Sequence, residues 1–177
     1  MIHGNSGVFS IHASVKERYA ERGLLALGRF NICVNGICYG VQADNASFLA
    51  CSADELSSRI LNRGNHTAPF SITANALEIA NAFTEYFFGT ETSPLGLSRS
   101  EFSMICLQLP FRVKWIPDGD SAFDDGSHIF HFDVSDKLVR LVCFRRLDNE
   151  IVDIVDSTID SNVFYSVLCL SLDSLLG

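Results

Sequence analysis

The sequence has few of the features that mark linkers, membrane spans and secretory leaders. Only 4 of its 177 residues are proline, and no low-complexity stretch or internal repeat is present, which predicts a single domain over residues 1–177. The longest apolar stretch, residues 163–176, is too short to cross a bilayer and is interrupted by Asp173. No positive run followed by a long apolar segment opens the chain, so we expect a cytoplasmic protein that does not bind membranes.

Motifs that carry catalysis or hold cofactors are also missing. The sequence contains no G-x-S-x-G elbow, no phosphate-binding loop, no G-x-G-x-x-G and no H-E-x-x-H. Residues 118–126 resemble a calcium loop in their aspartates and glycines, but Ala122 and Ile129 stand where an EF-hand needs oxygen ligands. We therefore expect no catalytic residue, no metal site and no cofactor.

An alternative interpretation of the sequence is that the protein is an enzyme. His131 and Asp133 are two residues apart on a predicted strand, so they share a face and could form a general-base pair. A small cytosolic hydrolase or nuclease could use this pair, or could use a cysteine as its nucleophile. A non-catalytic adaptor is a further alternative. A histidine on a half-buried strand is more often a structural residue, and we prefer that interpretation.

The cysteine pattern favours thiols over disulfides or metal ligands. None of the six forms a C-x-x-C pair, and most stand among apolar residues. Reduced cysteines pack as small hydrophobic side chains, and a reducing cytosol disfavours disulfides. We therefore expect six reduced thiols at Cys33, Cys38, Cys51, Cys106, Cys143 and Cys169.

Hydrophobic periodicity predicts an α+β fold with a mostly antiparallel sheet packed with about three helices. Asn35-Gly36 is a strong hairpin signal. Ser52 with Glu55 predicts a capping box for the first helix, Thr73 can cap the second, and Asp160 or Ser161 can cap the last. The expected strands are residues 8–15, 29–34, 37–41, 102–109, 111–116, 128–134, 138–145 and 150–155, and the expected helices are residues 52–64, 74–88 and 162–175.

Charge is distributed unevenly along the chain. Residues 1–117 carry nine acidic and nine basic side chains, whereas residues 118–177 carry twelve acidic and only four basic ones. The whole net charge of −8 therefore lies in the last third. Such a field repels nucleic acid and membrane phosphates and attracts basic partners, although charge runs are often simply solvated faces. We expect Arg140 and neighbouring arginines to pair with aspartates across strands.

Several short motifs stand at three places along the chain. They are Met1-Ile2-His3-Gly4-Asn5 with Phe9-Ser10-Ile11, then Gly28-Arg29-Phe30, Asn35-Gly36 and Tyr39-Gly40, and finally Phe123-Asp124-Asp125-Gly126 and Arg140-Leu141-Val142. Together these motifs resemble a family of immunity proteins of bacterial polymorphic toxin and contact-dependent growth inhibition systems. Phe144 stands where the resemblance leads us to expect an aromatic residue, often tryptophan.

The resemblance implies a stoichiometric inhibitor that binds a cognate toxin domain in a one-to-one complex. Such toxins are commonly nucleases with basic surfaces, and carboxylates can occupy the positions of phosphates on them. The motifs of the resemblance look structural, so charge alone assigns the contact surface. We expect the toxin to bind the acidic loop first, at Asp118, Asp120, Asp124 and Asp125. The second group is Asp153 on the last expected strand, with Asp156 and Asp160 just beyond that strand.

Overall fold

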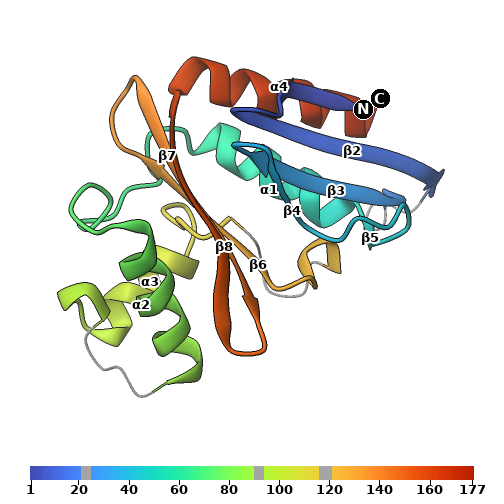
Figure 1. Cartoon of the computed structure of the whole chain (residues 1–177). Helices are drawn as coiled ribbons and strands as arrows, with labels where there is room; N and C mark the ends of the chain where they lie inside the picture. Colours follow the sequence, from blue (N-terminus) through green and yellow to red (C-terminus); the bar gives the residue numbers. More distant parts are fainter. Residues whose placement is uncertain (21–24, 90–93, 116–120) are drawn as a thin grey trace.

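A computed structural model describes residues 1–20, 25–89, 94–115 and 121–177 (Figure 1). These residues form two antiparallel sheets and four α-helices, which confirms the α+β prediction. The helices are α1 (Ala50–Leu61), α2 (Ala76–Phe88), α3 (Arg99–Leu107) and α4 (Ser161–Leu176). The strands are β1 (Ile2–Asn5), β2 (Phe9–Arg18), β3 (Ala26–Val34), β4 (Ile37–Tyr39), β5 (Ser47–Phe48), β6 (Ser127–Asp133), β7 (Leu138–Leu147) and β8 (Glu150–Asp160).

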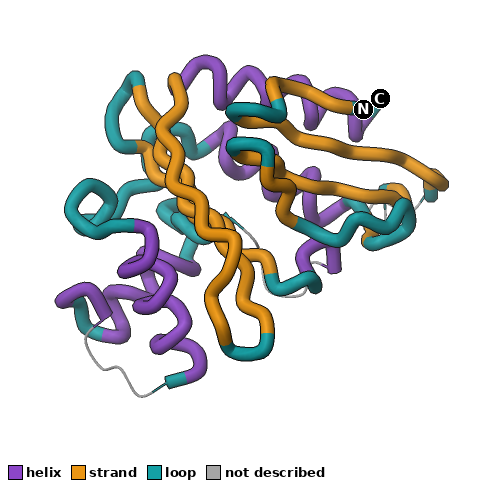
Figure 2. The backbone as a smooth tube through the Cα atoms, in the orientation of Figure 1, coloured by secondary structure: helices purple, strands orange, loops and turns teal. Residues whose placement is uncertain are grey.

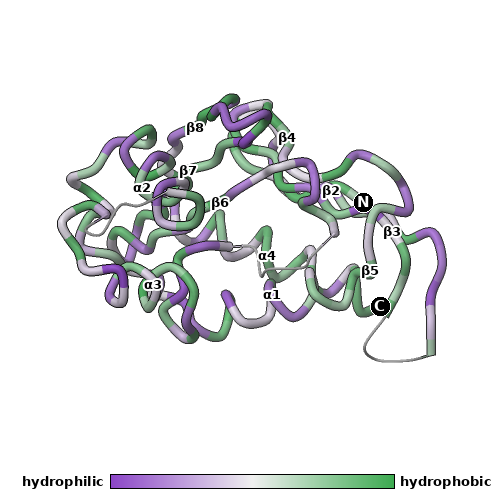
Figure 3. Tube along the Cα trace, turned by 90° about the horizontal axis from the view of Figure 1, so that it is seen from below, coloured by the Kyte–Doolittle hydropathy of each residue, from purple (hydrophilic) through white to green (hydrophobic). Residues whose placement is uncertain are grey.

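The N-terminal sheet has the order β1-β2-β3-β4, with β5 pairing beside β3. Alternate residues of β2 and β3, such as Ile11 and Ile32, are buried on one face. The predicted hairpin is confirmed, because Asn35 and Gly36 both have positive φ angles of 49° and 84° and join β3 to β4. Figure 3 shows hydrophilic residues (purple) at the far end of β2, where Glu17 and Arg18 still pair with Leu27 and Ala26 of β3.

The second sheet, with the order β6-β7-β8, is covered on both faces (Figure 2). On one face Phe130 and Phe144 pack with residues of α2 and α3. On the other face Ile129 and Leu141 pack with β2, β3, α1 and α4. This explains why β6 and the middle of β7 have few polar residues between their apolar ones. The β6–β8 sheet thus joins the two hydrophobic clusters.

The capping residues predicted from the sequence are right for one helix and wrong for two others. Asp160 caps α4 as predicted, accepting hydrogen bonds from the amides of Asn162 (2.9 Å) and Val163 (3.1 Å). The cap of α2 is Asn75, with Glu78 completing a capping box, so the prediction of Thr73 was wrong. The prediction of a Ser52 cap was also wrong, because α1 begins at Ala50 and Ser52 is buried inside it.

The expected strand at residues 102–109 is wrong, because this segment is helix α3. Ser98 accepts from the Glu101 amide and the Glu101 carboxylate accepts from the Ser98 amide, which forms the capping box that starts it. Phe102 and Cys106 then face the core one helical turn apart. The expected strand at residues 111–116 reduces, within its described residues, to one bridge between Lys114 and Phe130.

The expectation of six reduced thiols also needs correction. Cys33 and Cys38 face each other across the β3–β4 hairpin and form a disulfide. Cys106 and Cys143 are buried as predicted, whereas Cys51 and Cys169 are exposed. In the part of the chain that the structure describes, no helix is long and apolar enough to cross a membrane.

Candidate functional site

The structure spreads the predicted acidic residues over the β8 side of the molecule. Asp118 and Asp120 lie outside the described residues. Asp124 and Asp125 precede β6, and Asp124 is exposed. The other three lie at intervals along β8, at Asp153, Asp156 and Asp160. At about 3.3 Å per strand residue, the interval from Asp153 to Asp160 spans about 20 Å, so these acids form a strip rather than one compact cluster.

Arg145 of β7 binds two of these acids, Asp125 and Asp153. Its Nε lies 3.1 Å from Asp125 Oδ2, and its Nη1 lies 2.6 Å from Asp153 Oδ2. Nη2 donates to the carbonyl oxygen of Cys38 on β4, and the guanidinium carbon lies 5.2 Å from the centre of the Tyr39 ring. Burial lowers the pKa of Arg145, but hydrogen bonds to Asp125 and Asp153 outweigh burial and raise it overall. The guanidinium therefore stays charged and joins β4, β7, β8 and the acidic loop.

A second arginine, Arg140, binds Asp156 near the middle of the strip. Arg140 on β7 donates from Nε and Nη2 to the two carboxylate oxygens of Asp156, at 2.9 and 2.6 Å. Its Nη1 donates to the carbonyl oxygens of Ser71 (2.6 Å) and Ala74 (2.9 Å), just before α2. The predicted pairing of arginines with aspartates across strands is therefore confirmed.

These pairs leave much of the carboxylate surface open to solvent. The side chains of Asp153 and Asp156 are 44% and 40% exposed, although each binds an arginine. Two further exposed acids, Asp148 and Glu150, lie at the β7–β8 turn and were not singled out from the sequence. Their position at the turn between two expected strands was the available signal. Together these described acids form the acidic strip: Asp124, Asp125, Asp148, Glu150, Asp153, Asp156 and Asp160.

The second candidate, His131 with Asp133, lies inside the protein. His131 is 0% exposed and contacts Arg59 of α1, whose Nη1 lies 2.8 Å from His131 Nδ1. Because arginine can only donate, Nδ1 must accept, and the ring proton therefore lies on Nε2, 3.3 Å from Asp133 Oδ1. Tyr165 also donates to Asp133 Oδ1 at 2.8 Å.

Asp133 and Arg59 make further hydrogen bonds within this buried network. Asp133 Oδ2 accepts from the amides of Gly64 (2.8 Å) and His66 (3.1 Å). Arg59 also donates to Glu55 at 2.8 Å and to the Lys114 carbonyl oxygen at 2.7 Å. The network connects α1, β6, α4 and the segment after α1, as a structural polar core does.

Burial sets the protonation of the network. Burial and the charge of Arg59 together lower the pKa of His131 to about 4, although the hydrogen bond and charge of Asp133 oppose the change. Burial also lowers the pKa of His66, together with the charge of Arg59. His131 is thus neutral at pH 7 and shielded from solvent, so its ring offers no surface that a substrate could contact. This arrangement fits a structural role for His131 and Asp133 and not a general-base role.

Comparison with known proteins identifies the type of molecule. No curated protein matches the sequence. The fold is similar to the crystal structure of CdiI from Burkholderia dolosa AUO158, with a TM-score of 0.63 and 15% sequence identity, over 98% of this chain and 99% of that one. The family model of Immunity protein 42 matches residues 1–173. Because this match spans nearly the whole sequence, the chain belongs to the Immunity protein 42 family.

Proposed function

We propose that the protein binds the toxin domain of a contact-dependent growth inhibition system, or of a related polymorphic toxin system, in a one-to-one complex. The observation that carries the proposal is the match of residues 1–173 to an immunity protein family. The likeness of the whole fold to CdiI supports the choice of system. We expect the protein to act in the cytoplasm, by binding the toxin rather than by catalysis.

The charge distribution favours a basic toxin, and a nuclease in particular. Nuclease surfaces are positive because they bind phosphates, and carboxylates can occupy the same positions. The four basic residues beyond residue 117 are Lys137, Arg140, Arg145 and Arg146. Two of these, Arg140 and Arg145, already bind aspartates of the acidic strip. The excess of negative charge therefore lies on the acids that these arginines do not neutralise.

The acidic strip is the surface that we propose contacts the toxin, together with Asp118 and Asp120. Within the strip, Asp124 is exposed and forms no ion pair with another described residue. Asp153 and Asp156 are held in fixed orientations by arginines while keeping free surface. A carboxylate offers about four lone-pair sites, so these two can accept from a toxin cation in addition to their arginine. Asp125 and Asp160 each bind backbone amides of this chain and stand at the rim of the contact.

Neutralising two acids of the strip tests the contact surface. The variant Asp124→Asn with Asp148→Asn removes two exposed charges and keeps side-chain shape, and it should slow association with the purified toxin domain on the order of tenfold at low salt. The control variant Asp54→Asn with Asp173→Asn removes the same charge from exposed positions on α1 and α4. Equal association rates for both variants would reject the surface.

Cell survival tests the function separately from the surface. Co-expression of this chain with the toxin domain encoded beside its gene should allow growth, whereas expression of the toxin alone should kill the cells. Stopped-flow fluorescence should detect association of the purified toxin domain with this chain. Calorimetry should give a stoichiometry of one toxin domain per chain. Death of the cells in the presence of the folded chain would reject the proposed function whatever the variants show.

A further inference from the structure

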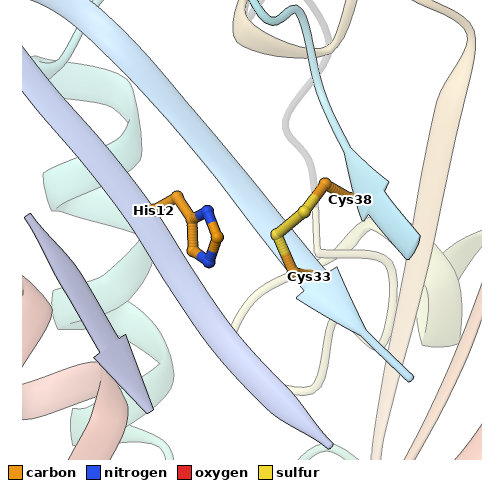
Figure 4. Close-up of side chains that lie close together, drawn as sticks. All are labelled: His12, Cys33 and Cys38. Atoms are coloured by element: carbon orange, nitrogen blue, oxygen red, sulfur yellow. A yellow bond between two sulfur atoms is a disulfide. The ribbon is translucent and has the colours of Figure 1, made fainter. Parts of the chain in front are cut away.

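Three potential metal ligands lie together on the outer face of the N-terminal sheet. Cys33 of β3 pairs with Cys38 of β4, and His12 of the neighbouring β2 projects from the same face (Figure 4). One ligand atom from each residue lies within 4.8 Å of the others. Cys33 is buried, whereas His12 and Cys38 are partly exposed, so an ion could reach the group from solvent.

We propose that, once the Cys33–Cys38 disulfide is reduced, the two thiolates and the His12 imidazole bind one zinc ion. Two thiolates and an imidazole form a ligand set that zinc prefers, and three protein ligands leave the fourth tetrahedral position for water. Zinc bonds of about 2.1 Å to nitrogen and about 2.3 Å to sulfur hold the ligand atoms within about 4 Å of one another. Once reduced, the two sulfurs must move apart to this spacing, and the His12 nitrogen must approach by up to about an ångström, which rotation about the side-chain bonds can supply.

The neighbours of His12 suit a ligand. Its Nε2 contacts the hydroxyl oxygens of Ser6 at 2.9 Å and Ser10 at 3.0 Å. A metal-bound histidine usually donates its second N–H to such an oxygen, which fixes the tautomer and the orientation of the ring. Ser10 is buried and pairs directly with Cys33 in the sheet, so this support is rigid. The hydroxyls leave Nδ1 as the atom that binds zinc.

The reduction that opens the site is a thiol–disulfide exchange. A thiolate of a small or protein dithiol attacks the partly exposed Cys38 sulfur, and the Cys33 sulfur leaves with the electron pair and takes a proton. The second thiol of the reductant then attacks the mixed disulfide, which releases the Cys38 thiol and the oxidised reductant. Binding of zinc to the two thiols finally releases two protons to solvent.

Either state fastens β4 to β3. This matters because the carbonyl oxygen of Cys38 accepts from Arg145, and the Tyr39 hydroxyl donates to the Asp153 carbonyl oxygen at 2.6 Å. The hairpin therefore supports the acidic strip, and the zinc ion replaces the disulfide as its clamp under reducing conditions. The inference does not depend on the proposed function, since it concerns this chain alone.

Cobalt and zinc titrations test the proposal on the whole chain. After phosphine reduction and removal of metal, the protein should bind one Co²⁺ with a thiolate-to-cobalt absorption band, and stoichiometric Zn²⁺ should abolish the band. The variants Cys38→Ser and His12→Gln should weaken Co²⁺ binding at least about tenfold, as loss of metal-site groups does. The control Cys169→Ser removes an exposed cysteine outside the group and should bind as the parent does.

The disulfide-bonded protein serves as a control that needs no substitution. It should show no cobalt band, and reduction should restore it, while circular dichroism confirms that each variant is folded. The proposal is overturned if the reduced parent lacks the band, or if the oxidised protein binds cobalt equally well. It is also overturned if the His12→Gln and Cys38→Ser variants both keep the parent's affinity.

Discussion

Acidification from pH 7 to pH 5 should destabilise the protein through His131. The ring has no exposed surface, its Nδ1 accepts from Arg59, and burial lowers its pKa to about 4. In the unfolded chain the same side chain titrates near about 6.5. Between these two values the unfolded chain binds a proton that the folded protein does not, so the free energy of unfolding falls as the pH falls.

The size of the effect follows from the gap between the two pKa values. Each unit of pKa difference corresponds to about 1.4 kcal/mol, so a folded value of about 4 sets a limit of about 3 kcal/mol once the pH is well below 4. At pH 5 the loss from His131 is about 2 kcal/mol, since most of that interval has been crossed. His66, whose pKa burial also lowers, adds to the loss in the same direction.

Asp133 acts in a different pH range. Burial raises its pKa, but hydrogen bonds from His131 and Tyr165 outweigh burial and lower it to about 2. A carboxyl group with a depressed pKa in the folded protein gives stability that is lost only as the pH falls below its ordinary value, which is about 3.9. The loss between pH 7 and pH 5 therefore belongs to histidines whose pKa is lowered in the folded protein, which are His131, His66 and the partly buried His12.

Urea unfolding at a series of pH values measures the effect. The free energy of unfolding should change little between pH 8 and pH 7, where the unfolded chain takes up only a small fraction of a proton at each histidine, and should fall steeply below about pH 6.5. In the variant His131→Asn, whose amide can accept from Arg59, the loss at pH 5 should be smaller by about 2 kcal/mol. A parent protein equally stable at pH 7 and pH 5, or an unchanged pH dependence in the variant, would refute the reasoning.

Three further substitutions test the packing, a cap and the hairpin. Phe83→Ala should lower the free energy of unfolding by about 3–5 kcal/mol in urea titrations, because this 2% exposed ring fills the space against Phe130 at 5.1 Å. Ser98→Ala removes the cap of α3 and should cost about 1 kcal/mol, seen as faster amide hydrogen exchange at Glu101 and little change elsewhere. Gly36→Ala should cost about 1 kcal/mol in thermal unfolding, since φ is 84° there and no atom lies within 4 Å of the added carbon.

The sequence predicts the elements whose signals are local. Asn35-Gly36 specifies the β3–β4 hairpin because both residues accept positive φ, and Asp160 specifies the start of α4 because its carboxylate can reach two free amides. The β6–β8 strands are also recognisable from their β-branched and aromatic residues. Their common sheet is not, because the division into two sheets depends on contacts between distant segments.

Helix α3 shows how an apolar run misleads. The segment from Phe102 to Leu109 is apolar and short, and periodicity alone does not separate a buried strand from a buried helix. The decisive signal is the capping box of Ser98 and Glu101, which lies just before the apolar run. Its partner signal is the four-residue spacing of Phe102 and Cys106, both of which are buried.

The negative charge of the acidic strip can be predicted from the sequence, but the arrangement of its residues cannot. The excess of acid beyond residue 117 is visible in the sequence, and so is the chance that Arg140 pairs across strands. The approach of Cys38 and Tyr39 of β4 to Arg145 is not visible, because it depends on packing between the two sheets. Nor does the sequence show that Glu55, which resembles a capping residue, is buried beside Arg59.

The paired and unpaired acids of the strip should contribute differently to binding. Asp124, Asp148 and Glu150 are exposed, so their field extends into solvent and raises the encounter rate with a basic surface. Asp153 and Asp156 are partly neutralised by arginines and add little to this long-range field, but their carboxylates are already oriented. Oriented groups lose little side-chain entropy when they accept a further hydrogen bond, so they favour a long-lived complex more than a fast encounter. The arginines therefore do not cancel the acidic strip as a binding surface, because they fix the direction in which two of its carboxylates face a partner.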